Sequence, residues 1–147
     1  MRVVLQRVNK ANVKVDQKVI GKIGQGILVL VGFTFNDTIE DIEYIINKII
    51  NLRIFDDENG IMNKSLLDIN GSILSVSQFT LYANTRKGRR PSYDESLGGK
   101  EAEPLYNLFN QKLKETNLNI QTGIFGAEMK VELINDGPVT IIIDSKN

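Results

Sequence analysis

The sequence predicts an α+β fold in which a layered sheet carries two helices on one face. Strand patterns dominate the 147 residues, and only two segments repeat apolar residues at the helical spacings of three and four. No stretch rich in Pro, Ser or Gly divides the chain, and no internal repeat is evident. We therefore expect one domain with one core over residues 1–147.

The N-terminal third is expected to form strands. Residues 2–8 alternate weakly and are rich in Val and Leu, which favours a strand. Residues 12–15 and 19–23 flank Asp16-Gln17-Lys18 in the arrangement of a short hairpin. Residues 27–33 are apolar on both faces, as is typical of a central strand.

Two segments have the pattern of amphipathic helices. In the first, Thr38 can cap the N-terminus, with Asp41 in the capping-box position three residues on. Its predicted buried stripe is Ile39, Ile42, Ile45, Ile46, Ile49 and Leu52. The second helix tolerates Pro104 in its first turn. Its predicted stripe is Ala102, Leu105, Tyr106, Phe109 and Leu113.

The remaining segments are predicted to be strands and loops. Residues 72–79 alternate as in a strand, and residues 84–99 form a long loop rich in Arg, Lys, Gly, Ser and Pro. Residues 127–134 and 139–144 have the pattern of two C-terminal strands. Asn135-Asp136-Gly137-Pro138 joins them and is interpreted as a hairpin turn.

The absence of two residue types restricts the chemistry. The chain contains no Cys and no His, which excludes thiolate nucleophiles, Cys-based zinc sites and a Ser-His-Asp triad within the chain. Any hydrolytic chemistry must therefore use hydroxyls, carboxylates, Lys, main-chain dipoles or groups of the substrate. The carboxylates show no convincing acid-base pair and no calcium-loop spacing, so no metal and no cofactor are expected.

The charge balance limits the class of partner. Eighteen basic and 18 acidic residues give a net charge of zero, whereas proteins that bind long nucleic acids usually have a basic excess. A short single-stranded RNA end remains compatible with this balance. No apolar run approaches the ~20 residues of a membrane span, and no signal-peptide pattern is present. We therefore expect a cytoplasmic protein that binds neither membrane nor DNA.

Ser77-Gln78-Phe79-Thr80 and Asn135-Asp136-Gly137-Pro138-Val139-Thr140 are the first candidate site segments. The hydroxyls and the amide of residues 77–80 can donate hydrogen bonds to a substrate or an oxyanion, although such groups at a strand end often bond nearby backbone instead. Thr80 has no His base to activate it as a nucleophile. Pro138 belongs at an edge or at the start of a strand, and a Gly-Pro bond can be cis at low cost.

Two further segments could contact RNA. Arg86, Lys87, Arg89 and Arg90 place four positive charges within five residues, which suits either the phosphates of an RNA end or a solvated loop. Residues 122–127 place two glycines around Phe125. This aromatic residue could seat a base, or it could belong to the core.

Taken in order, these segments resemble the D-aminoacyl-tRNA deacylase family. The matching segments are residues 1–8, 51–58, 74–83, 88–92, 122–129 and 135–140. Ile61 and Tyr93 depart from the family pattern, in which we expect Lys and Phe, but neither lies in the two signature motifs.

The resemblance implies hydrolysis of the ester bond of D-aminoacyl-tRNA, and of glycine mischarged on tRNA for alanine, at the terminal adenosine. It implies a layered β/β/α sandwich, with a barrel-like sheet and two main helices on one face. It also implies a homodimer with its active sites at the subunit interface. There, residues 77–80 of one subunit would face a cis Gly137-Pro138 bond of the other, whose main-chain groups would reject L-amino acids.

Roles for individual residues follow from the resemblance. The expected catalytic residues are Ser77, Gln78, Phe79 and Thr80, with the backbone of Phe79 and Thr80 binding the oxyanion. The expected substrate-binding residues are Gly137, Pro138, Val139, Thr140, Phe125, Gly126 and Met129, of which Phe125, Gly126 and Met129 suit the adenine. Arg86, Lys87 and Arg89 would bind phosphate. The alternatives are a non-catalytic module that binds an RNA end and a metal-dependent esterase.

Overall fold

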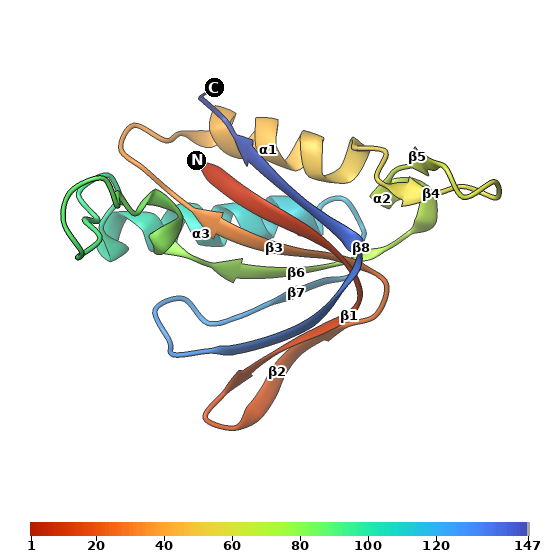
Figure 1. Ribbon diagram of the computed structural model, residues 1–147, viewed down its shortest axis with the longest axis horizontal. Helices are drawn as coiled ribbons and strands as arrows, with labels where there is room; N and C mark the ends of the chain where they lie inside the picture. The colour runs from red at the N-terminus through yellow and green to blue at the C-terminus, as the bar shows by residue number, and fades with distance from the viewer. Residues whose placement is uncertain (147) are drawn as a thin grey trace.

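The computed structural model describes residues 1–146 and has an α+β fold (Figure 1). Its large sheet comprises β1 (Arg2–Val15), β2 (Lys18–Ile23), β3 (Gly26–Gly32), β6 (Ser72–Ser77), β7 (Ile120–Thr122) and β8 (Lys130–Asp144). A small sheet comprises β4 (Phe55–Asp56) and β5 (Met62–Lys64). The helices are α1 (Ile39–Asn51), α2 (Leu66–Ile69), α3 (Gly99–Lys114) and the 3₁₀ turn η1 (Phe79–Tyr82).

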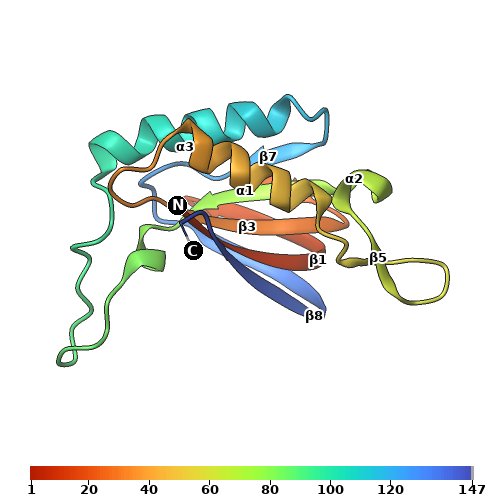
Figure 2. The same ribbon diagram turned by 90° about the horizontal axis from the view of Figure 1, so that it is seen from above.

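The large sheet curls into a barrel-like layer because β1 changes its neighbour along its length. The first half of β1 pairs with β3 and the second half with β2, whereas β8 runs antiparallel to both halves. Strands β3, β6 and β7 continue the sheet in parallel. Figure 2 shows α1 and α3 side by side over one face. The predicted fold class is confirmed. None of the helices described in residues 1–146 has the length and apolar character of a membrane span.

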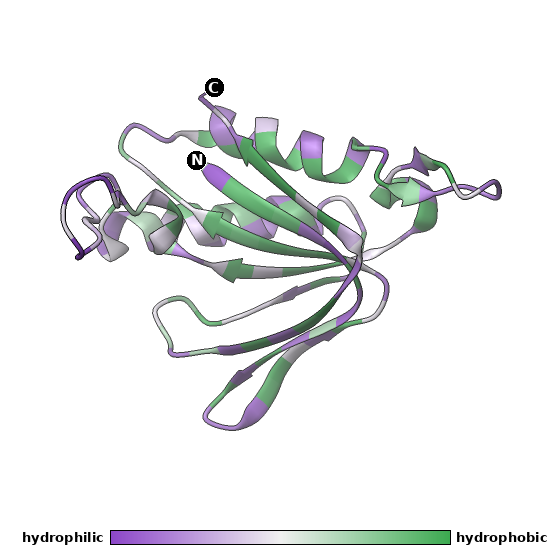
Figure 3. Cartoon of the chain, in the orientation of Figure 1, coloured by the Kyte–Doolittle hydropathy of each residue, from purple (hydrophilic) through white to green (hydrophobic). Residues whose placement is uncertain are grey.

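Two apolar cores lie on opposite faces of the sheet. The larger core packs the sheet against the helices and includes Val3, Leu5, Val29, Ile45 and Phe109, all at most 1% exposed. The smaller core fills the inside of the curled sheet and consists of Val8, Ala11, Val13, Ile23, Leu28, Leu74 and Val76. Figure 3 shows the apolar strands between hydrophilic loops. The sequence-based prediction of one core is thus incomplete, because the curl of β1 makes an inner layer.

Helix α1 follows its sequence signals. The Asp41 carboxylate accepts a hydrogen bond from the Thr38 backbone N–H at 2.8 Å, as expected of a capping box. Ile42, Ile45, Ile46 and Ile49 are buried, which confirms most of the predicted stripe. Ile39 is 39% exposed and Leu52 is only partly buried, so the two ends of the predicted stripe are less covered than its middle.

Helix α3 begins earlier than predicted. Gly98 is its N-cap, so Pro104 is the sixth helical residue and lies in the second turn, not the first. The missing N–H of Pro104 leaves the carbonyl of exposed Lys100 without its usual helical donor. The predicted stripe holds at Ala102, Tyr106, Phe109 and Leu113, while Leu105 is only partly buried.

The strand predictions need three corrections. The strand expected over residues 72–79 ends at Ser77, and the chain then turns into η1. The separate strands expected at 2–8 and 12–15 form the single strand β1, although the hairpin with β2 is confirmed. The short elements β4, β5, α2 and β7 were not predicted, because segments of two to four residues carry too little periodicity.

The predicted C-terminal hairpin is wrong. Residues 130–144 form one strand, β8, whose two halves both pair with β1 instead of with each other. Val8 is opposite Asn135 and Gln6 is opposite Thr140, so residues 136–139 all lie opposite Arg7. These four residues form a bulge, which agrees with the inability of Pro to donate to a sheet ladder. The long β1 provides the template that keeps both halves in one strand.

Candidate active site

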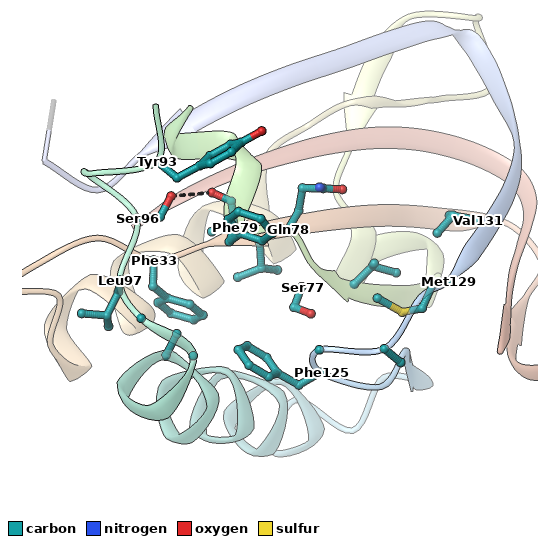
Figure 4. Close-up of a pocket in the computed structure, with 18 residues that line it drawn as sticks. Phe33, Ser77, Gln78, Phe79, Tyr93, Ser96, Leu97, Phe125, Met129 and Val131 are labelled. Carbon is teal, nitrogen blue, oxygen red and sulfur yellow. Dashed lines mark hydrogen bonds between the residues drawn. The ribbon is translucent and has the colours of Figure 1, made fainter. Parts of the chain in front are cut away.

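A pocket of about 620 Å³ opens where β6 ends, between the sheet, α3 and the loop before β8 (Figure 4). This volume lies within the range of small-molecule sites. Six of the residues predicted from the sequence line it, namely Ser77, Gln78, Phe79, Phe125, Gly126 and Met129. The structure therefore brings together residues from β6 and from the loop before β8, about 50 positions apart along the chain.

The end of β6 sets the backbone of the pocket. The Gln78 N–H donates to the Val31 carbonyl of β3 at 2.7 Å, which is the last bond before the chain leaves the sheet. Gly32 permits this close approach, because a Cβ at that position would lie 2.9 Å from the Gln78 carbonyl oxygen. The chain then enters η1, in which the N–H groups of Phe79 and Thr80 precede the first intrahelical donor, Leu81. Within residues 1–146 these two N–H groups have no backbone partner.

Only some of residues 77–80 lie at the pocket. Ser77, Gln78 and Phe79 line the pocket, but Thr80 does not. The Gln78 Nε2 donates to the Thr80 hydroxyl. The Thr80 hydroxyl therefore accepts a hydrogen bond from an amide, which is not a base that could activate it as a nucleophile.

A buried hydrogen-bond cluster lies between β6 and α3. The Tyr106 hydroxyl of α3 donates to the Ser75 carbonyl at 2.9 Å, and the Ser75 side chain is fully buried beside it. Burial raises the pKa of Tyr106, so the phenol stays protonated at neutral pH. Phe125 packs on Tyr106 with ring centroids 5.9 Å apart and also lines the pocket. Phe125 is thus partly buried and serves both the core and the site.

The loop before α3 closes the opposite side of the pocket. Leu97 N–H donates to the Phe33 carbonyl at 3.0 Å, and the Ser96 hydroxyl donates to the Phe79 carbonyl at 2.9 Å. Sequence reasoning missed Phe33, Ser96 and Leu97 as pocket residues, and it noted Tyr93 only as a departure from the family pattern. No local signal marks them, since each reaches the pocket through tertiary contacts.

Gly137 and Pro138 form an exposed, braced bulge in β8. Their peptide bond is cis, as the resemblance implied. Gly137 has φ +144, and a Cβ there would lie 2.9 Å from the Val139 nitrogen. The Asn135 side chain accepts from the Val139 N–H and donates to the Thr140 hydroxyl, each at 2.8 Å. Val139 and Thr140 therefore brace the bulge within the chain.

The bulge lies in the middle of β8, whereas the pocket lies at the end of β6. Ser77 pairs with Val31, which pairs with Val3, whereas the bulge lies opposite Arg7. Four residues along a strand span ~13 Å, and the three strand spacings from β6 to β8 add ~14 Å in the other direction. The two signature motifs therefore do not meet within one chain.

The predicted phosphate residues lie on an exposed loop beside the pocket. Arg86, Lys87, Arg89 and Arg90 lie between Asn84 and Ser92, whose backbones pair with each other at 2.8 Å. Among the described residues, none of these four cations forms an ion pair. The part of the chain that the structure describes also contains no group of three potential metal ligands.

The comparisons with known proteins show one family over nearly the whole chain. The family model for D-Tyr-tRNA(Tyr) deacylase matches residues 4–144. A D-aminoacyl-tRNA deacylase of Clostridium acetobutylicum is 58% identical over 99% of this chain and 98% of its own length. One of Thermosipho melanesiensis is 60% identical over 99% and 98%.

Two solved structures share the fold. A c-Myc DNA unwinding element binding protein has a TM-score of 0.92 and 43% identity, with 98% of both chains covered. A probable eukaryotic D-amino acid tRNA deacylase has a TM-score of 0.84 over 97% of both chains, and at 19% identity it supports the fold alone.

The fold and the full-length matches define an ester hydrolase. More specifically, the chain belongs to the D-aminoacyl-tRNA deacylase family.

Proposed function

We propose that the protein hydrolyses the ester bond of D-aminoacyl-tRNA, and of glycine mischarged on tRNA for alanine, in the pocket at the end of β6. The observation that carries this proposal is the end of β6, where Ser77 and Phe79 line the pocket and the backbone N–H groups of Phe79 and Thr80, at the start of η1, have no backbone partner among residues 1–146. An acyl ester placed there would meet three neutral donors. Such donors stabilise the negative charge that develops on a carbonyl oxygen in the transition state.

The reaction needs no His or Cys in this arrangement. Water attacks the ester carbonyl carbon, and the N–H groups of Phe79 and Thr80, with the Ser77 hydroxyl, bind the oxyanion. The bond to the ribose oxygen then breaks, a proton returns to that oxygen, and a free amino acid and tRNA leave. The neighbouring ribose hydroxyl of the terminal adenosine positions the water, and Gln78 orients the ribose. The substrate supplies the group that the chain lacks.

Selection against L-amino acids requires a second chain. The carbonyls of Gly137 and Pro138 from a partner subunit would occupy the space that an L side chain needs, while a D side chain points outward. Glycine has no side chain to clash, so its ester is also accepted. The separation between the bulge and the pocket in one chain supports a site made of the pocket of one subunit and the bulge of the other.

A partly exposed apolar row supports the homodimer. Ile142, Val4 and Leu30 are directly opposite one another on β8, β1 and β3, so they point to the same face. Ile142 is 68% exposed, and neither Val4 nor Leu30 is fully buried. A two-fold interface over this row would cover it and exchange the two bulges symmetrically.

The charge distribution supports the end of a tRNA as the bound segment. The net charge is zero, and the cations of residues 86–90 are gathered on one loop next to the pocket. A short single-stranded end needs few phosphate contacts, whereas duplex DNA would need many. Aminoacyl-tRNA is used in translation, so this substrate supports a cytoplasmic protein.

The decisive experiment measures amino acid release from D-Tyr-tRNA, L-Tyr-tRNA and glycine esterified to tRNA for alanine, in the presence of a chelator. Release of D-Tyr and glycine, with L-Tyr retained, supports the proposal. Binding without release would support the RNA-end-binding module, and loss of activity in chelator would support the metal-dependent esterase. Sedimentation of the same sample tests the dimer.

A further inference from the structure

Phe79 and Tyr93 form an exposed aromatic pair at the mouth of the pocket (Figure 4). Their ring centroids are 5.1 Å apart and their planes are inclined by 66°, which is an edge-to-face contact. The exposed fractions of the two residues are 57% and 42%. An edge-to-face pair keeps ring faces available to a third planar group.

The backbones that carry these rings are restrained. The Ser96 hydroxyl donates to the Phe79 carbonyl at 2.9 Å, and the Ser96 N–H donates to the Tyr93 carbonyl at 3.0 Å. Ser96 thus connects the backbones of the two aromatic residues. The pair is a preorganised surface, which lowers the entropic cost of binding a planar ligand.

The pair lies between the deep part of the pocket and the basic loop. Phe33 and Phe125 line the pocket beyond Ser77, while Tyr93 follows Ser92, which closes the loop of residues 84–92. The cations of that loop are unpaired within the described chain. A single-stranded polymer that leaves the pocket over Tyr93 would therefore pass from an apolar cavity to an aromatic surface and then to a positively charged loop.

This sequence of surfaces matches the chemistry of a single-stranded RNA end. Single strands are bound by aromatic rings that stack on bases and by nearby cations that contact the backbone. The proposed function places the terminal adenosine in the pocket, so the group at the mouth is the preceding nucleotide. Because every base has a π-face, this contact would depend little on base identity.

We infer that Phe79 and Tyr93 form a stacking subsite for the base immediately 5′ to the terminal adenosine, with the phosphate of that nucleotide directed to the loop of residues 84–92. This inference rests on the proposed function and deepens it. The pocket alone recognises the aminoacyl-adenosine, and the aromatic pair extends recognition to the polynucleotide.

The experiment compares two substrates that differ only beyond the terminal nucleoside. The kcat/KM of wild type, Tyr93→Ala and Tyr93→Phe is measured on D-Tyr-tRNA and on D-Tyr-adenosine. Tyr93→Ala should lower the ratio of kcat/KM on D-Tyr-tRNA to kcat/KM on D-Tyr-adenosine roughly tenfold, in the range expected for one stacked base. Tyr93→Phe should preserve this ratio. Tyr44→Ala is the matched control, because Tyr44 is 44% exposed on α1 and should not change the ratio.

A second substrate tests the same contact with the wild-type protein, so that the result does not depend on how well a variant folds. With wild type, kcat/KM on D-Tyr-tRNA that has an abasic site before the terminal adenosine should be lower than on intact D-Tyr-tRNA by roughly the same factor. On this abasic substrate, Tyr93→Ala should not lower kcat/KM further. An unchanged ratio for Tyr93→Ala overturns the inference. Equal losses on both substrates also overturn it and would assign the pair to the amino acid side chain, or to the subunit contact if the variant sediments as a monomer. Failure of wild type on both substrates would instead reject the proposed function.

Discussion

The Arg7 Nε donates to the Asp136 carbonyl at 2.7 Å, which ties the middle of β1 to the bulge in β8. Arg7 is only 8% exposed, and its Nη1 donates to the Ile54 carbonyl at 2.7 Å. One buried guanidinium thus satisfies the Asp136 carbonyl in the bulge of β8 and the Ile54 carbonyl just before β4. A planar fork of donors suits such a task better than a single ammonium group.

Replacing Arg7 by Met should therefore loosen the bulge. Two carbonyls lose their donor, and each unsatisfied buried acceptor costs about 1–3 kcal/mol. We expect a decrease of about 2–4 kcal/mol in the free energy of unfolding, together with increased hydrolysis of L-Tyr-tRNA. Denaturant titration and the release assay measure the two effects. Arg53→Met, at an exposed position, is the control, and equal stability of the two variants would contradict the prediction.

Pro138→Ala should raise activity on L-aminoacyl esters. In the proposed site, the carbonyls of residues 137 and 138 block the L side chain, and Ala at 138 would no longer hold the chain in this turn. D-Tyr-tRNA hydrolysis should change less than L-Tyr-tRNA hydrolysis. Pro91→Ala, in the exposed basic loop, provides the control for a Pro replacement as such. If L-ester hydrolysis does not rise, the steric account of Gly137 and Pro138 is wrong.

Ser77→Ala should lower kcat on D-Tyr-tRNA by roughly 10²-fold or more, the range for removal of one oxyanion donor. The fold should survive, because Ser77 is only partly buried at the end of β6. Ser72→Ala, at the other end of the same strand, removes a hydroxyl outside the pocket and should leave kcat unchanged. Single-turnover kinetics distinguish the chemical step from binding. Comparable rates for both variants would exclude Ser77 from the reaction.

Asp41 should contribute to stability in a pH-dependent way. Burial acts to raise its pKa, but hydrogen bonds from Ser145, the Thr38 backbone and Lys146 together hold the pKa of Asp41 well below its ordinary value. A carboxyl whose pKa is lower in the folded state stabilises the fold above its unfolded pKa of about 3.9, and this contribution is lost as pH falls below that value. Protonation in the unfolded state drives the loss.

Denaturant unfolding of wild type and Asp41→Asn at pH 7 and pH 3 tests this sign. The stability difference between the two proteins should shrink by about 1 kcal/mol at pH 3, since one pKa unit corresponds to about 1.4 kcal/mol. Glu103→Gln, on the exposed side of α3, should show no such change. A difference that stays constant between the two pH values would contradict the prediction.

Local patterns predicted the regular elements well. The isoleucine spacing of α1, the capping pair Thr38 and Asp41 and the apolar run of β3 each act over a few neighbouring residues. Such signals are present in the sequence because the helix and strand periods determine which side chains share a face. They could not predict that η1 replaces the end of the β6 strand, since this depends on the approach of Gln78 to Gly32.

For the candidate site, the sequence by itself determined the chemistry available. Without His and Cys, the chemistry is limited to hydroxyls, carboxylates, Lys, backbone groups and the substrate, and the motifs at residues 77–80 and 135–140 supply hydroxyls and backbone groups. Only the tertiary structure decided where these motifs lie. The long β1 pairs with both halves of β8, so the expected hairpin becomes a bulge held by Arg7, far from its own chain's pocket. Strand pairing joins residues more than 100 positions apart, and no local pattern specifies such partners.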